Sequence, residues 1–128
     1  MKAVIDTNVL VSSIWKPSGN ARLVTSSIIC GLVTPCYDSR IMSEYRIVIA
    51  RPKFRFPPEE VQYLLSVIID YVRPTPIPDA DVKDEDGRAF YEVAKYCNAP
   101  LVTGNIKHFP DDPIVMSLAD FCSLYLKG

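Results

Sequence analysis

The chain has 128 residues, which is enough for one domain with a hydrophobic core, and we expect a single domain over residues 1–128. Its composition, 48% apolar and 23% charged, is ordinary for a globular protein, and no apolar stretch is long enough to span a bilayer. A formal net charge of −1 excludes binding of nucleic acids by overall charge. It leaves open a nuclease with acids at its centre and basic residues at its rim.

The N-terminus favours the cytoplasm. Met1 and Lys2 lead directly into a strand-like run and an acid, which is not the pattern of a signal peptide. The four cysteines show no C-x-x-C spacing, which disfavours a zinc site, and in a cytosolic protein we expect them to be reduced, semi-buried thiols: Cys30, Cys36, Cys97 and Cys122.

The first fifteen residues predict a buried strand followed by a helix. Ala3–Ile5 is a continuous apolar run, as in the middle of a parallel sheet, and Asp6 ends it with a charge. In open α/β sheets, ligands bind beyond the carboxyl ends of the strands, which is where Asp6 falls. Alternatively, Asp6 caps the following helix, and the residues around it favour neither role.

Strand-like runs alternate with helical periodicity along the chain, which predicts βαβ units and a parallel sheet. Further strands are expected at 32–34, 71–75, 100–103 and 114–116, with Pro74 and Pro76 confining 71–75 to a sheet edge. Helices are expected from an Asn20 N-cap to Cys30, from Asp38 or Ser39 to before Pro52, from Pro57 or Pro58, from about Asp86 to Cys97, and after a Ser117 cap. Gly31 is expected to stop the first of these.

Glu44 is an acid in an unusual place on its helix. Ile41, Tyr45 and Val48 belong to the apolar stripe of this helix, and Glu44 lies at the edge of that stripe rather than on the solvent face. The alternative is a surface pair with Arg40, four residues earlier.

Asp86 closes the polar connector 76–86 and begins a helix. It lies four residues before Phe90 and seven before Val93, so it is placed on the buried face at the N-terminal end of this helix. Helix N-termini favour anions, so capping is the alternative role, and it is compatible with metal binding.

These residues predict an acidic site at one end of one sheet. Asp6 and Asn105 follow strands, while Glu44 and Asp86 lie on the buried sides of helices. Three carboxylates at short range need a cation, and oxygen ligands suit Mg²⁺ or Mn²⁺ better than zinc. Such a metal activates water and clamps the attacking and leaving oxygens of a phosphate ester. The pattern therefore points to phosphodiester hydrolysis.

A basic run with aromatics follows the Glu44 helix: Arg51, Lys53, Arg55, Phe54 and Phe56. It fits the rim of a nucleic-acid site, with basic groups on phosphates and aromatics on bases. Taken alone, the run is more typical of a solvated loop.

Three segments resemble the PIN-domain family: VIDTNVLVS at 4–12, SEYRIVIARPKF at 43–54 and LVTGNIKHFP at 101–110. The similarity covers nearly the whole chain, and the last two segments are close to the toxin subgroup of bacterial toxin–antitoxin pairs, related to VapC-type toxins. The resemblance implies a three-layer α/β/α sandwich with a five-stranded parallel sheet. It also implies a metal-dependent endoribonuclease that uses Mg²⁺ or Mn²⁺.

The resemblance also implies roles for individual residues. Asp6, Glu44 and Asp86 would be the metal-binding acids, with Asp84 as a rival to Asp86. Asn105 stands where many members have a fourth Asp, which puts a fully occupied second metal site in doubt.

Other polar residues would support these acids. Thr7, Asn8 and Thr103 match positions that orient water or the acids, and Asp111 and Asp112 are candidates to compensate for Asn105. For His108, the only histidine, we prefer a loop residue beside the cleft to a general acid or base.

The expected partners are an RNA substrate, a cognate antitoxin protein and a second copy of the chain, with no membrane. Phe121 and Tyr125 in the last helix are either a dimer surface or core. The alternative function is a catalytically weak or inactive PIN-like binding module. A phosphoacceptor receiver domain is disfavoured because no acidic pair follows the first strand and no Lys closes the fifth.

Overall fold

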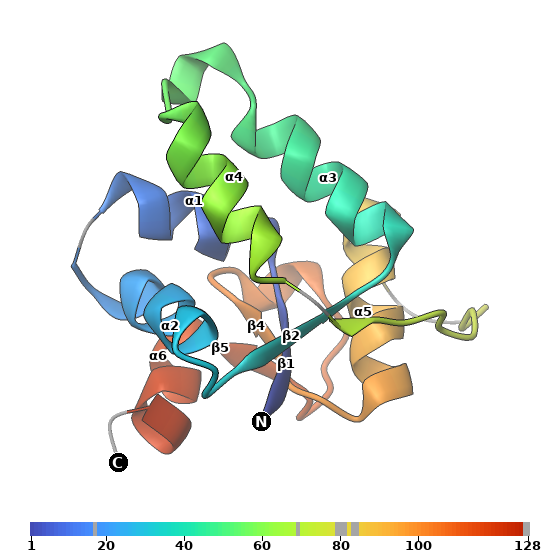
Figure 1. Cartoon of the computed structure of the whole chain (residues 1–128). Helices are drawn as coiled ribbons and strands as arrows, with labels where there is room; N and C mark the ends of the chain where they lie inside the picture. Colours follow the sequence, from blue (N-terminus) through green and yellow to red (C-terminus); the bar gives the residue numbers. More distant parts are fainter. Residues whose placement is uncertain (17, 69, 79–81, 83–84, 127–128) are drawn as a thin grey trace.

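The computed structural model describes residues 1–16, 18–68, 70–78, 82 and 85–126 (Figure 1). The strands are β1 (Lys2–Ile5), β2 (Thr34–Tyr37), β3 (Asp70–Tyr71), β4 (Leu101–Thr103) and β5 (Val115–Ser117). The helices are α1 (Thr7–Trp15), α2 (Asn20–Ile29), α3 (Ser39–Ile49), α4 (Pro58–Ser66), α5 (Glu85–Cys97) and α6 (Leu118–Phe121). Shorter helical turns are η1 (Pro52–Phe54), η2 (Ile106–His108) and η3 (Cys122–Leu126). None of the helices in these ranges combines the length and the apolar character that crossing a bilayer requires.

The sheet is parallel, with the strand order β3-β2-β1-β4-β5. Four of its strands span three or four residues, while β3 at the edge spans only two. The central strand β1 is fully buried from Ala3 to Ile5, as its apolar run predicts. Ile5 is in register with Val102 of β4. Asp6, the residue after β1, therefore lies beside Thr103, the last residue of β4.

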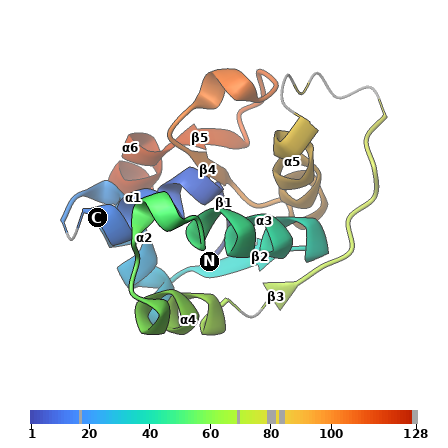
Figure 2. The same ribbon diagram turned by 90° about the horizontal axis from the view of Figure 1, so that it is seen from above.

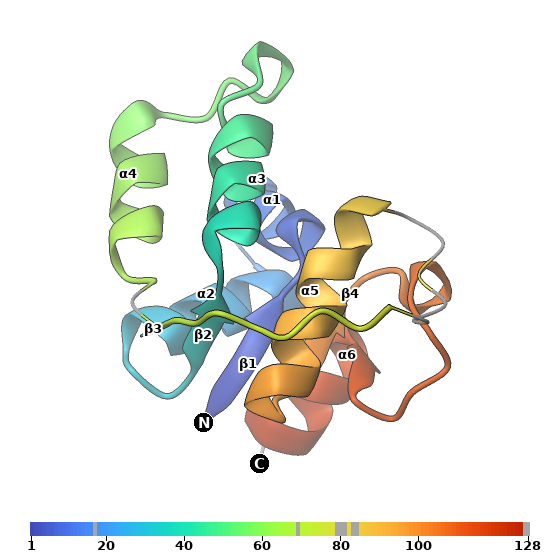
Figure 3. The same cartoon turned by 90° about the vertical axis from the view of Figure 1, so that its right-hand side faces the viewer.

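Helices cover both faces of this sheet. Figures 2 and 3 show α5 on one face and α2 and α6 on the other, while α3 and α4 rise past the carboxyl end of β1 in Figure 1. Buried side chains of α5, Phe90, Val93 and Ala94, join those of β1 in the core. The predicted α/β class with a parallel sheet between helices is confirmed.

The start of β2 differs from the prediction. Strand β2 begins at Thr34, because the N–H groups of Leu32 and Val33 donate to the Ser27 carbonyl at the end of α2 (2.9 and 3.1 Å). These amides close the helix and are not available to the sheet. Leu32, which was expected in this strand, is 64% exposed.

The helix ends follow the predicted chemistry with one correction. Asp38 accepts a hydrogen bond from the Ile41 N–H (3.0 Å), and Ser117 accepts one from the Asp120 N–H (3.0 Å). Asn20 is the first residue of α2 rather than its cap. Gly19 takes the cap position with φ 106°, a conformation that favours glycine.

The end of α2 and the edge position of β3 agree with the predictions, although the bounds of β3 differ. Gly31 has φ 87°, which agrees with its predicted role after α2. Strand β3 lies at the sheet edge, as predicted, but at Asp70–Tyr71 rather than 71–75. Phe121 is fully buried and therefore belongs to the core rather than to a dimer surface, while Tyr125 is half-exposed.

Candidate active site

Asp6 lies at the carboxyl end of β1, where its backbone N–H donates to the Val102 carbonyl (2.9 Å). The hydroxyl of Thr103, at the end of β4, donates to its carboxylate (2.7 Å). Asp6 occupies the N-cap position of α1, but its side chain makes no capping hydrogen bond. The Thr103 hydroxyl of the neighbouring strand is therefore its side-chain partner, while the N–H groups of Thr7 and Asn8 at the start of α1 lie near enough to favour its charged form.

Burial is the main influence on the Asp6 carboxylate. It raises the pKa of Asp6 above the usual value of an aspartate, because the charged form loses water. The Thr103 hydroxyl and the N–H groups of Thr7 and Asn8 oppose this rise in pKa. A raised pKa marks a carboxylate whose charge is costly without a further positive partner.

Glu44 reaches the same region from α3, where the Thr7 hydroxyl donates to its carboxylate. The alternative pair between Arg40 and Glu44 is not formed. Arg40 instead donates to Asp38 (2.8 Å) and to Glu92 of α5 (2.7 Å). Glu44 therefore faces α1, at the edge of the buried stripe as predicted.

Tyr45 fixes α3 on the other side of Asp6. Its side chain is fully buried, and its hydroxyl donates to the carbonyl of Ile5. Burial, with the negative charges of Asp6 and Glu44, holds the pKa of Tyr45 well above its usual value, so the hydroxyl stays protonated. Adjacent residues of α3 thus contact the residues before and after Asp6, and the stripe pattern alone did not reveal this second role of Tyr45.

A cleft of about 270 Å³ opens at this point. It brings together the predicted residues Asp6, Thr7, Asn8 and Glu44, and His108 lines it as expected. The other lining residues are Val48, Arg51, Gly87, Phe90 and Phe109. Thr103 does not line the cleft but contacts Asp6.

The predicted third acid lies at the edge of what the structure describes. Asp84 falls outside the described residues, and Asp86 lies in the first turn of α5, with its side chain outside the description. Its neighbour Gly87 lines the cleft, and a Cβ on Gly87 would lie 3.1 Å from the Phe109 ring. The start of α5 therefore passes directly beside the cleft.

Asn105 lies beside the cleft rather than in its wall. Its backbone N–H donates to the Thr103 hydroxyl (3.0 Å), and its side-chain Nδ2 lies 3.1 Å from His108 Nε2. Asp112 is engaged elsewhere, by the Ile114 N–H (2.9 Å), Tyr91 (2.8 Å) and Lys95 (3.0 Å). It therefore does not replace the missing acid at position 105, and its exposed neighbour Asp111 does not line the cleft either.

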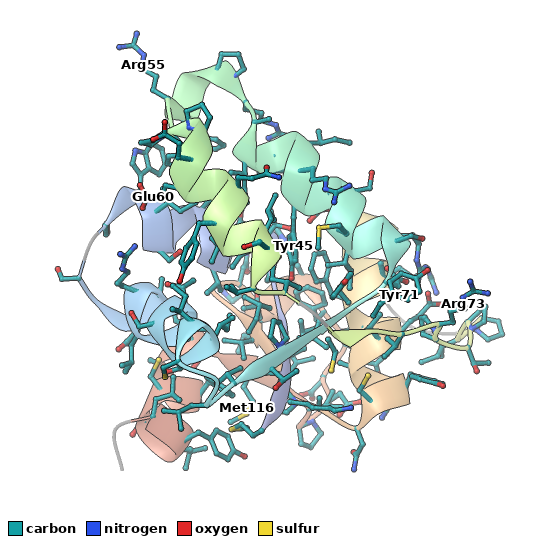
Figure 4. All side chains as sticks on the ribbon, viewed as in Figure 1. Tyr45, Arg55, Glu60, Tyr71, Arg73 and Met116 are labelled. Carbon is teal, nitrogen blue, oxygen red and sulfur yellow. The ribbon has the colours of Figure 1, made fainter. Side chains whose placement is uncertain are left out.

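The basic and aromatic run only partly forms the predicted rim. Arg51 lines the cleft, but Arg55 projects away from the body of the protein (Figure 4). The rings of Phe54 and Phe56 stack on each other (5.2 Å, 7°), and Trp15 packs edge-on against Phe54 (5.1 Å). These two phenylalanines therefore anchor η1 to the end of α1.

The chemistry of the donors fits a hard cation. Asp6 and Glu44 supply carboxylate oxygens to one cleft, and Mg²⁺ is commonly held by one or two carboxylates, with waters and phosphate oxygens as its other ligands. Among the described residues, no three or more His, Cys, Asp or Glu side chains are grouped closely enough to hold a metal ion. The described part of the site is thus a two-carboxylate site.

Comparison with known families agrees with this arrangement. The family model described as PIN domain matches residues 2–107, which include Asp6, Glu44, Asp86 and Asn105. Neither the curated proteins nor the solved structures gave a match. Because the match spans well over half of the chain, the protein belongs to the PIN domain family.

Proposed function

We propose that this protein is a metal-dependent endoribonuclease that hydrolyses RNA phosphodiesters. PIN domains are generally nucleases, which supports hydrolase activity. The observation that carries the proposal is that Asp6 and Glu44 line one cleft, each carboxylate held by a threonine hydroxyl. Two oriented carboxylates in a polar cleft suit a divalent cation and, through it, a phosphate ester.

Asp6 and Glu44 would hold Mg²⁺ or Mn²⁺, and Asp86 is proposed as the third acid at the start of α5. When bound, the cation would supply Lewis acidity, which favours deprotonation of water and stabilises negative charge on the phosphate. Thr103 and Thr7 keep the Asp6 and Glu44 oxygens aimed, since each donates its only hydroxyl proton to one carboxylate.

We also propose that the protein acts as the toxin of a toxin–antitoxin pair. Resemblance of segments 43–54 and 101–110 to the toxin subgroup supports a toxin whose cognate antitoxin blocks the cleft. A homodimer is part of the same proposal, and the half-exposed Tyr125 and the exposed Leu124 in η3 are available to it.

The deciding experiment is cleavage of a panel of single-stranded RNAs in Mn²⁺, in Mg²⁺ and in EDTA. Purified protein would be compared with Asp6→Asn and Glu44→Gln, which keep side-chain size but remove charge. Asp120→Asn, at an exposed position in α6, is the matched control. We expect metal-dependent cleavage by the wild type and the control and its loss in both site variants.

Other results would contradict the proposal in distinct ways. Absence of cleavage in every metal by protein free of a bound partner would favour a binding module. Cleavage that survives EDTA and both site substitutions would place the chemistry elsewhere. Cleavage of single-stranded DNA at the same rate would refute the preference for RNA.

A further inference from the structure

A second hollow of about 490 Å³ lies between α3 and α5. Glu44, Val48, Arg51 and Phe90 line both this hollow and the candidate active-site cleft, so the two are continuous. We call the second hollow the α3–α5 groove. A polymer bound across Asp6 and Glu44 has room to continue along it.

Three arginines line the α3–α5 groove: Arg40, Arg51 and Arg88. Among the residues that the structure describes, Glu44, at the boundary with the cleft, is the acid that lines it. Within the described lining, positive charge is thus in excess, whereas the whole chain has a net charge of −1. An anionic polymer is therefore attracted to this groove and not to the protein surface in general.

Two of the arginines are held in place by a shared set of contacts. Arg40 donates to Glu92, whose side chain is only 3% exposed, and Glu92 accepts the N–H of Ile77 (3.0 Å). Arg88 donates to the carbonyl of the same Ile77 (2.9 Å). Figure 3 shows this segment after β3 crossing α5, so one backbone residue links both guanidinium groups.

For Arg40, these contacts leave donors available to a ligand. Asp38 and Glu92 engage three of the five N–H groups of Arg40, whose side chain is 48% exposed. A guanidinium already fixed by its neighbours loses less conformational entropy when it binds a phosphate. Glu92 is thus a positioning residue for Arg40.

Arg51 is different because it stands where the groove meets the cleft. It is exposed, and within the described part of the chain no carboxylate lies at ion-pair distance from it. Apolar surface lies beside it, including Ile47, which is 63% exposed. Cationic and apolar groups together suit a nucleotide strand, which offers both phosphates and base faces.

We propose that the α3–α5 groove binds the single-stranded RNA that flanks the scissile phosphate, with Arg51 and Arg88 contacting successive phosphates and Arg40 a third. The inference rests on the proposed function, because the continuity with the acidic cleft selects RNA as the occupant. It places the flanking strand on α3 and α5 rather than along η1.

The test measures binding without cleavage. A fluorescein-labelled single-stranded RNA of about 12 nucleotides is titrated with Asp6→Asn protein. Its fluorescence anisotropy is followed at several NaCl concentrations. Arg51→Ala and Arg88→Ala are added to this background, and Arg46→Ala is the control, since Arg46 is also exposed on α3 but does not line the groove. Arg51→Lys tests whether charge is sufficient.

Each groove substitution is expected to weaken binding roughly 3- to 10-fold and to reduce the salt slope by about 0.7 per lost phosphate contact. Arg46→Ala and Arg51→Lys should keep the slope. A slope that does not change in Arg51→Ala and Arg88→Ala would overturn the proposal, as would an equal loss in Arg46→Ala. Equal competition by duplex RNA, or arginine-dependent binding of an acidic peptide in place of RNA, would also overturn it.

This test separates the groove from the proposed chemistry. Arginine-dependent RNA binding by a protein that cleaves nothing would refute the nuclease and leave the groove. RNA cleavage lost in Asp6→Asn, together with arginine-independent binding, would refute the groove and leave the nuclease.

Discussion

Thr103 and Asp6 are 97 residues apart in sequence, and the hydroxyl of the first donates to the carboxylate of the second at 2.7 Å. Thr103 is fully buried, and its oxygen also accepts the N–H of Asn105. A single hydroxyl thus orients the acid at the end of β1 and anchors the turn after β4. The pairing of these two strands makes the contact an intrinsic part of the sheet.

Thr103→Val should weaken the site while leaving the core filled, because valine has nearly the same shape. Loss of the hydroxyl removes a contact that lowers the pKa of Asp6, so this pKa should rise and metal binding should need higher pH. Metal affinity at pH 6 should fall about 10- to 100-fold, the usual range for loss of a group that orients a ligand. Isothermal titration with Mn²⁺ measures it. Thr103→Ser, which restores the hydroxyl, should recover most of the affinity, and an equal loss in both variants would contradict this role.

Asp6→Asn should raise the melting temperature of the metal-free protein by a few degrees at neutral pH. The folded-state pKa of Asp6 lies above its unfolded value, so its contribution to stability is complete below the unfolded pKa and is lost as pH rises through the folded pKa. Asparagine carries no charge to bury, so its advantage should shrink in acid. Melting curves in EDTA at several pH values measure the difference.

Added Mn²⁺ should reverse that order, since the cation stabilises only the protein that binds it. Wild-type protein should then melt above Asp6→Asn. A variant that melts below the wild type in EDTA at neutral pH would show that the buried charge is already compensated.

Tyr45→Phe should lower the free energy of unfolding by about 1–2 kcal/mol, because the buried carbonyl of Ile5 loses its hydroxyl donor. Urea denaturation measures the loss. Tyr96→Phe removes a hydroxyl from a side chain that is 56% exposed and should have little effect. Equal stabilities of the two variants would mean that the Tyr45 hydroxyl does not hold α3 to β1.

Asp112→Asn should destabilise the protein by on the order of 1 kcal/mol at neutral pH. The Ile114 N–H, followed by Lys95 and Tyr91, holds the pKa of Asp112 below its usual value. Its contribution is therefore present above the unfolded pKa and is lost as pH falls through the folded one, so the two proteins should converge in acid. Urea unfolding at neutral and acidic pH measures this, with the exposed neighbour Asp111→Asn as control. A constant difference at all pH values would exclude the charge as its cause.

The sequence was most informative where one residue determines a local outcome. Asp6 was expected at the end of a buried strand because it ends an apolar run with a charge, and the structure has it there. Asp38 and Ser117 could be predicted as helix caps because capping depends on nearby backbone N–H groups. The edge position of β3 followed from the prolines after it. Asp6 and Glu44 line one cleft, as expected from an acid at a strand end and an acid at the edge of a buried helix stripe.

The rest depends on contacts that periodicity does not encode. The stripe on α5 predicts one buried face, yet Tyr91 and Glu92 are buried as well. Glu92 accepts the N–H of Ile77 from the segment that crosses α5, and the Tyr91 hydroxyl donates to Asp112. Arg40 looked like a partner for Glu44, four residues away on the same helix, but Asp38 and Glu92 from outside that turn bind it. When a basic side chain lies near several acids, spacing in the sequence alone does not show which of them it pairs with.

Helix α1 is fastened at both of its ends to the same stretch of chain. Thr7 at its start bonds to Glu44 of α3, and Trp15 at its end packs on Phe54 of η1. Helix α1 and the stretch from α3 to η1 are thereby joined by one contact at each end of α1. Two separated contacts resist both translation and rotation of α1 relative to α3. Because Asp6 directly precedes α1 and Glu44 lies on α3, we expect these two contacts to limit changes in the spacing between their carboxylates. Hydrogen exchange should find the amides of α1 and α3 opening together, as one cooperative unit.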